Sequence, residues 1–363
     1  MNKILKTLVI SFASIVMFAT QSNAGELTVT GTAKATYNII KGGDHTFAGH
    51  GIGKALGITN EIDFGASGEM DNGWTWNYQT QFDPGDTAAT AADGNANGVD
   101  DSQLTVTTPF GTFGAFQSEG ALRVENKGSQ SVYARPTDIG LVTGINTTND
   151  IDGFNNVQYH TAAGLLPFDT TVKVAYATGL QNTMNAGNAV GEAPSALGDS
   201  ATQIQLITVP YAGLTVGADY YRTNGAKKAL NDTVLAQGEE SGGAFATYKI
   251  GAASIGFSKS VQAPQISYVV NEAIGSTVSQ DDQTKYSVAY NLTDNTSISY
   301  EKEKGKRELV DNSATNNYSG QSLQLAHAMG GMTTTVVYSS HDNVAYRLNN
   351  DVEQMLLAVA IAF

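Results

Sequence analysis

The 363-residue sequence contains no cysteine, which excludes disulfide bonds and thiol chemistry. Proline is scarce, with 7 residues against 39 glycines, whereas tyrosine and phenylalanine number 16 and 13. This composition favours a protein of strands and turns, because proline interrupts β-sheets. Basic residues are also few, 20 against 34 acidic ones, for a formal net charge of −14. No nucleic-acid partner is expected, since binding phosphates requires a basic surface.

Long hydrophobic runs are absent except near the N-terminus. Lys3 and Lys6 precede an apolar run over residues 8–19, and a Ser-Asn-Ala triplet follows it. This pattern predicts a secretory signal peptide over residues 1–24, and the alternative, a membrane anchor, would need about 18 apolar residues. Cleavage would remove two lysines and no acids, for a formal charge of −16. We expect one exported domain over residues 25–363.

The last segment, residues 355–363, is uncharged and alternates large apolar side chains with alanine. This period of two indicates a strand with one apolar face. As a helix, nine residues would reach only about 14 Å, too short for a bilayer. As a strand tilted by roughly 40° they cover about 23 Å, close to the ~25 Å apolar band of an outer-membrane barrel. We expect this strand to close a sheet by pairing with residues 26–40.

The chain upstream repeats one unit, in which two strands joined by a tight turn are followed by a long polar loop. Short turns such as Asn72-Gly73 mark one rim, and connections of about ten to more than thirty residues mark the other. The expected strands cover residues 26–40, 58–67, 74–82, 101–109, 112–118, 154–161, 169–178, 201–209, 214–222, 243–249, 253–261, 283–291, 295–303, 318–327, 332–340 and 352–363.

An even number of strands with short turns at one rim and long loops at the other is typical of bacterial membrane barrels. The sequence therefore predicts an all-β fold, a 16-stranded antiparallel transmembrane β-barrel with short periplasmic turns and long extracellular loops. The alternative is an acidic β-sandwich or repeat adhesin. Apolar faces on nearly every strand, each backed by a polar face, leave too little material for the dry core that a sandwich needs.

Three stretches carry a resemblance to a known family. They are the hairpin Leu104-Thr-Val-Thr-Thr-Pro-Phe-Gly-Thr-Phe-Gly114, the strand Phe154-Asn-Asn-Val-Gln-Tyr159 and the strand Leu166-Pro-Phe-Asp-Thr-Thr-Val-Lys-Val-Ala-Tyr-Ala177. With the apolar final strand ending in phenylalanine, they resemble the general porins of Gram-negative bacteria. The resemblance implies a homotrimer in the cell outer membrane that passes small hydrophilic solutes and ions passively, without a required cofactor. It also implies that the third loop, here residues 119–153, folds into the barrel and narrows the pore.

Candidate site residues follow from this plan. The candidate constriction residues are the charged side chains of the third loop, Glu119, Arg123, Glu125, Lys127, Arg135 and Asp138. The candidate wall residues are those that strand alternation points into the lumen, Lys34, Glu61, Asp63, Lys173, Asp219, Lys285, Glu301 and Glu303. The arginine cluster that many such porins carry opposite the loop is not evident. Because carboxylates predominate, we expect a mild preference for cations.

The second long loop contains a partial calcium motif. Oxygen-bearing or backbone ligands would come from Asp93, Asn95, Asn97, Val99 and Asp101. The glycine at the sixth position matches the motif, but leucine replaces the closing glutamate at the twelfth. The segment is either a calcium site or a plain polar turn, and calorimetric titration with calcium would distinguish them.

Two other interpretations concern partners and chemistry. Residues 301–308 alternate charge, and Lys304, Lys306 and Arg307 are candidates for contacts with lipopolysaccharide phosphates, the alternative being a solvated rim. The sequence offers no motif-bearing serine partner for its strand histidines, so no enzymatic activity is expected. Besides a general diffusion channel, a substrate-selective channel and a non-conducting adhesin or structural barrel remain open.

Overall fold

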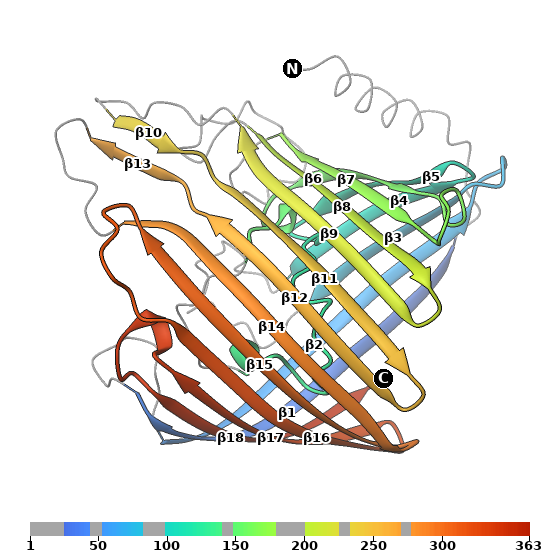
Figure 1. Cartoon of the computed structure of the whole chain (residues 1–363). Coiled ribbons are helices and arrows are strands. Elements are labelled where there is room, and N and C mark those ends of the chain that lie inside the picture. Colours follow the sequence, from blue (N-terminus) through green and yellow to red (C-terminus); the bar gives the residue numbers. More distant parts are fainter. Residues whose placement is uncertain are drawn as a thin grey trace.

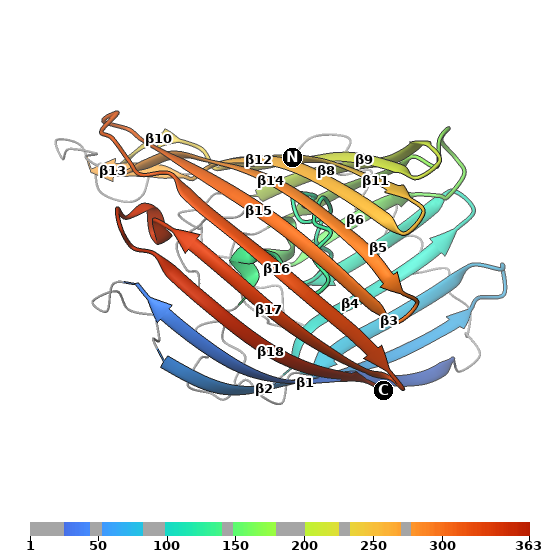
Figure 2. The same cartoon turned by 60° about the horizontal axis from the view of Figure 1, so that its bottom comes forward.

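A computed structural model describes residues 25–43, 53–82, 99–139, 148–178, 200–224, 233–269 and 277–363. Sixteen of its strands form one closed antiparallel barrel (Figures 1 and 2), as the sequence predicts. The first eight are β1 (Glu26–Gly42), β2 (Gly53–Glu69), β3 (Thr75–Phe82), β4 (Val99–Thr108), β5 (Gly111–Gln117), β6 (Asn156–Thr161), β7 (Thr171–Ala177) and β8 (Ser200–Tyr211). The others are β9 (Leu214–Asn224), β11 (Glu240–Ile250), β12 (Ala253–Ala263), β14 (Val278–Thr293), β15 (Thr296–Leu309), β16 (Tyr318–Met329), β17 (Met332–Asp342) and β18 (Val352–Ala362). The predicted signal peptide lies outside the described residues.

The barrel closes between its first and last strands. β1 pairs with β18 in a register that sets Tyr37 opposite Leu357, which confirms the predicted seam. Beyond β18, the amide of Gly31 donates to the carbonyl of Phe363 at 2.8 Å, and the amide of Phe363 donates back at 3.0 Å. Closure leaves the sheet without an unpaired edge, which a lipid environment requires because it offers no hydrogen-bond partners.

Alternation along each strand separates an apolar outside from a polar inside. On β18 the side chains of Met355 and Leu357 are 53% and 44% exposed, whereas the inward-facing Gln354 is 1% exposed. The same pattern recurs around the barrel, with Phe257 and Tyr286 among the exposed aromatic residues. An apolar outward band with a polar interior is what a lipid-embedded, water-filled barrel requires.

The two rims differ as expected. Turns on one rim are tight, and Gly73, Gly213 and Gly331 adopt positive φ values of 78°, 83° and 85° there, a conformation that only glycine adopts without strain. The other rim carries the long connections. Two of them contribute a small sheet that the sequence does not predict, formed by β10 (Thr233–Gln237) and β13 (Ile266–Val269) (Figure 1).

Helical structure is confined to short 3-10 turns, η2 (Pro136–Asp138), η3 (Ile151–Gly153) and η4 (Val344–Tyr346), within the described ranges. Across those ranges, no helix has the length and apolar character needed to cross a membrane.

Candidate functional site

The connection between β5 and β6 folds into the barrel and lies along its inner wall (Figure 2, green). Its backbone amides donate hydrogen bonds to wall side chains from β9 to β16. The pairs are Val124 to Asp219 (2.9 Å), Gln130 to Ser287 (3.0 Å), Val132 to Ser299 (3.0 Å), Tyr133 to Gln324 (2.9 Å) and Thr137 to Glu303 (3.0 Å). The predicted inward fold of the third loop is confirmed. We call residues 119–153 the constriction loop.

Wall side chains also donate to carbonyls of the constriction loop. Gln205 on β8 reaches Leu122 at 2.6 Å, and Gln354 on β18 reaches Ile139 at 2.6 Å. A loop has no strand ladder to satisfy its backbone groups, so these amides and carboxylates supply the missing partners. The inward polar residues of the wall therefore fix the position of the loop as well as making the lumen polar.

Three of the predicted wall acids lie beneath the constriction loop. Asp219, Glu301 and Glu303 point inward as predicted, but only 6%, 0% and 2% of their surfaces are exposed. Glu301 accepts a hydrogen bond from the Ser131 hydroxyl at 2.7 Å and another from Ser129. These carboxylates hold the loop from behind, and they do not face the open lumen.

Arg135 ties the tip of the constriction loop to the wall. Its Nε and Nη2 donate to both carboxylate oxygens of Asp138 at 2.7 and 2.8 Å, and its Nη1 lies 3.6 Å from Glu303 Oε1. Lys285 Nζ lies 3.9 Å from the same oxygen. Burial alone would lower the pKa of Arg135, but the charges of Glu303 and Asp138 raise it overall, so the guanidinium stays charged. The predicted residues Arg135, Asp138, Lys285 and Glu303 thus form one network.

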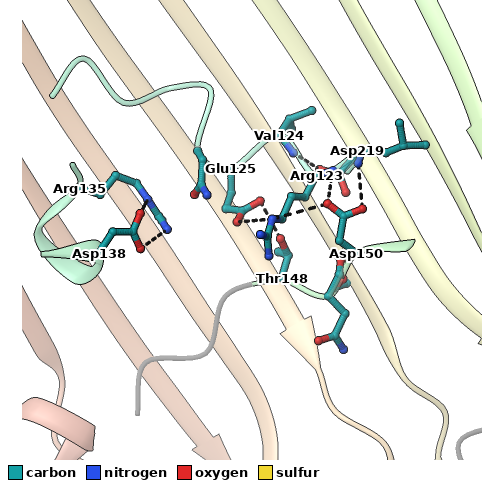
Figure 3. A network of polar contacts seen from close by, with 12 residues as sticks. Arg123, Val124, Glu125, Arg135, Asp138, Thr148, Asp150 and Asp219 are labelled. Atoms are coloured by element: carbon teal, nitrogen blue, oxygen red, sulfur yellow. Dashed lines mark hydrogen bonds and ion pairs between the residues drawn. The ribbon is translucent and has the colours of Figure 1, made fainter. Parts of the chain in front are cut away.

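A second network holds the base of the loop (Figure 3). Asp150 accepts the amides of Leu122 and Arg123 at 2.8 and 2.9 Å, and its carboxylate lies 3.6 Å from Arg123 Nε. Arg123 Nε is also 3.9 Å from buried Glu125, which accepts the Thr148 hydroxyl at 2.7 Å. The network holds more carboxylates than bases. It adds Asp150, which the sequence did not single out as a site residue.

Burial within this network changes the titration of its acids. Desolvation, together with the neighbouring charge of Asp150, raises the pKa of Asp152 to about 6. Desolvation also raises the pKa of Asp150, against the hydrogen bonds from Leu122 and Arg123. The charged form of a buried carboxyl is disfavoured in this way whenever solvation is lost and another acid is near.

Other predicted residues stay accessible to the lumen. On the constriction loop, Lys127 and Asp138 are exposed, while Glu119 and Arg123 are half-buried. On the wall strands, half-buried inward positions are occupied by Lys34, Glu61, Asp63 and Lys173. Lys34 Nζ lies 5.7 Å from the ring centroid of Tyr133, so the first strand approaches the loop.

Glutamine side chains extend this polar wall. Gln79 donates to Asp63 at 3.4 Å, and Gln103 donates to Gln79 at 2.9 Å, which links β2, β3 and β4 across the inner face. These residues were missing from the predicted site. They could have been predicted from their alternation with apolar neighbours along each strand, because alternation assigns uncharged amides to the lumen in the same way as it assigns acids.

The calcium prediction falls mostly outside the described residues. Asp93, Asn95 and Asn97 are not described, and Val99 and Asp101 belong to β4. Within the described part of the chain, no group of three histidine or acidic side chains is placed to hold a metal ion. Calcium binding by this segment stays a prediction.

Arg307 is turned into the barrel. Its Nε and Nη2 donate to Asp281 at 2.8 and 2.9 Å, and its guanidinium carbon lies 4.2 Å from the ring centroid of Tyr346. Of the three expected lipopolysaccharide contacts, Lys304 and Lys306 remain on exposed positions. Arg307 and the two lysines therefore lie on opposite faces of β15.

A closed 16-stranded barrel with an inward-folded constriction loop defines the porin-type fold. Solved porin structures have the same fold. A porin structure is 14% identical with a TM-score of 0.61, and an anion-selective porin from Comamonas acidovorans is 10% identical with a TM-score of 0.64; each alignment covers 93% of this chain and all of the other. The trimer form of OmpT, an outer membrane protein of Vibrio cholerae, is 13% identical with a TM-score of 0.57 over 94% of this chain and all of the other. No protein-family model and no curated protein matches the sequence. The chain has the general porin fold.

Proposed function

We propose that this protein is an outer-membrane channel through which small hydrophilic solutes and ions diffuse passively. The observation that carries the proposal is the constriction loop, whose backbone is hydrogen-bonded to wall side chains across the interior of a closed barrel. A loop fixed in this way narrows the lumen to a defined opening. Solutes are sieved by size and by the charges on either side of the opening, with no covalent step.

The placement of the charged residues supports a mild preference for cations. The predicted residues that stay accessible are balanced, with Glu61, Asp63, Glu119 and Asp138 against Lys34, Arg123, Lys127 and Lys173. The buried predicted residues are not balanced, with Glu125, Asp219, Glu301 and Glu303 against Arg135 and Lys285. Buried charges are screened less by salt than exposed ones. Those of the excess carboxyl groups behind the loop that are ionised bias the opening toward cations, whereas a solved neighbour with the same fold is described as anion-selective.

Recording from the purified protein in planar bilayers tests the proposed function. We expect stepwise conductance increases, and closures in groups of three because we propose a homotrimer, as in the solved trimer form of the Vibrio cholerae protein. In a potassium chloride gradient, the zero-current potential should have the sign of potassium preference. A potential favouring chloride would contradict the cation preference. Saturation of the current by one solute would favour a substrate-selective channel, and absence of conductance would favour an adhesin or structural barrel.

The lipid-facing surface supports a more specific partner, lipopolysaccharide. A row of side chains crosses four strands on the outward face near the long-loop rim, in the paired order Lys259, Thr284, Lys304 and Ser319. A cavity of about 450 Å³ lies over this row. Two residue pairs further from the rim, on the same face, the exposed rings of Phe257 and Tyr286 lie with their centroids 5.4 Å apart. Cations and hydroxyls above an aromatic surface suit a phosphate headgroup above acyl chains.

Replacing both Lys259 and Lys304 with glutamine is expected to lower lipopolysaccharide retention several-fold, because the row would lose both of its cations, although Lys306 also lines the cavity. Native mass spectrometry of the detergent-purified barrel measures the fraction carrying lipid. The matched control replaces Lys41 and Lys54, two exposed lysines on β1 and β2 near the same rim, with glutamine. Equal loss in both variants would mean that only overall charge matters, and the proposed contact would be rejected. Conductance should be unchanged in both.

A further inference from the structure

A second concave surface lies inside the barrel, between the constriction loop and the short-turn rim. It has a volume of about 430 Å³ and is lined by side chains of β8, β9, β11, β12 and β14, together with one residue of the loop. The polar lining residues include Gln130, Thr215, Thr247, Lys249, Ser254 and Asn291, and the lining also contains Tyr248. The volume is in the range of small-ligand sites, and the cavity is separate from the Arg123 and Arg135 networks.

Strand register gathers the polar groups of this cavity. Thr247 lies directly opposite Thr215, and Lys249 lies directly opposite Ser254. Directly opposed residues have Cβ atoms about 5 Å apart, and residues two apart on a strand share a face. Thr215, Thr247, Lys249 and Ser254 therefore form one compact group of an ammonium and three hydroxyls.

The cavity is cationic in an otherwise acidic protein. Lys249 is its charged lining residue, and the lining includes no carboxylate. Among the described residues, no acid forms an ion pair with Lys249 within 4.0 Å. The Oδ1 of Asn291 accepts the Ser297 hydroxyl at 2.9 Å, so its amino group is the part left to donate toward the cavity. The cavity therefore offers mainly hydrogen-bond donors, and these suit the acceptor oxygens of an oxyanion.

We propose that this cavity is an exit-side subsite for small hydroxylated oxyanions, in which Lys249 binds a carboxylate or phosphate and the threonine and serine hydroxyls bind the hydroxyls of the same solute. The subsite rests on the proposed channel function, in which the short-turn rim faces the periplasm. It gives an acidic channel a local attraction for anionic solutes that have passed the constriction loop. Because solutes must also leave, binding is weak, with a dissociation constant on the order of millimolar.

Planar-bilayer recordings with additions on the short-turn side test the subsite. Potassium gluconate and glycerol 3-phosphate are the two oxyanion probes, acetate tests the need for hydroxyls, and glucose tests the need for charge. We expect saturable current reduction by gluconate, glycerol 3-phosphate or both, with the more effective one identifying the oxyanion class. The Lys249→Gln variant should raise the half-saturating concentration by roughly tenfold. Thr247→Val should weaken the current reduction by gluconate or glycerol 3-phosphate and leave the effect of acetate unchanged.

The control is Lys54→Gln, which removes the same charge from an exposed position on β2. Equal effects of Lys54→Gln and Lys249→Gln, or equal reduction by glucose, would overturn the subsite. A channel that conducts but shows no saturation would overturn the subsite and leave the proposed function standing. If the barrel does not conduct, calorimetry of gluconate and glycerol 3-phosphate binding to the detergent-purified protein decides the subsite separately. A heat of binding that is present in the unmodified protein and lost in the Lys249→Gln variant supports the subsite. Absence of any heat of binding rejects the subsite.

Discussion

Replacing residues 117–155 with a two-residue Asn-Gly turn is expected to raise single-channel conductance roughly two- to threefold, because the constriction is removed while the barrel remains. The joint is sterically simple, since Phe116 and Asn156 on adjacent strands already pair, and Asn-Gly favours the tight turn of a hairpin. The same change should increase cation preference. It uncovers Asp219, Glu301 and Glu303 together with Lys285, so the wall gains net negative charge facing the solution.

Bilayer recording in a salt gradient measures both effects of the excision in one experiment. The control shortens another long connection, residues 310–317, by four residues, which should change neither conductance nor selectivity. The barrel is expected to survive, because the wall groups that lose the loop face a lumen where water can replace the lost hydrogen bonds. Unchanged conductance would show that the constriction loop does not set the opening. Increased conductance without increased cation preference would refute the role assigned to the buried acids.

Gly31→Val is expected to impair closure of the barrel. A Cβ atom at this position would lie 2.7 Å from the carbonyl oxygen of Glu61 and 2.8 Å from the ring of Phe363. The exposed ring can rotate away, but the Glu61 carbonyl belongs to a paired strand and cannot. Overpacking of this kind costs about 1–3 kcal/mol, at the seam where Gly31 and Phe363 exchange their two hydrogen bonds.

Heat denaturation followed by electrophoretic mobility measures this effect, as a lower temperature for loss of the folded band and a lower yield of assembled barrel. Ala35→Val is the matched control, because it places the same side chain on the same strand and face at an exposed position. Channels that do assemble with Gly31→Val should conduct normally, since the position faces outward. A melting temperature equal to that of Ala35→Val would show that the seam tolerates the extra atoms.

Much of the fold could be predicted because its determinants are local. Alternation of side chains is a property of the extended backbone, so Gln354 and Met355 are assigned to opposite faces by position alone. The tight turns are encoded by glycines at positive φ, such as Gly73. Sixteen strands, their pairing order and the closing seam between β1 and β18 follow from these local patterns together with the alternation of short and long connections.

The candidate site was predicted in part. Alternation placed Asp219, Glu301 and Glu303 inward, and the resemblance to general porins implied that residues 119–153 fold into the barrel. Alternation carries no information on what covers an inward residue, so the sequence did not show that these carboxylates lie beneath the loop. It likewise left open the face on which Arg307 lies, because the expected strand ended at residue 303, whereas β15 continues to Leu309.

The sequence by itself determined which side chains face lipid and which face the lumen, where the chain turns, and that the sheet closes. Only the tertiary structure decided which wall residues anchor the constriction loop, how β10 pairs with β13, and how five strands and Gln130 enclose the exit-side cavity. The physical reason is the range of the interactions. A strand period and a tight turn depend on neighbouring residues, whereas the contact of Gln354 with Ile139 joins a barrel strand to the loop inside the barrel, across 215 positions of the sequence.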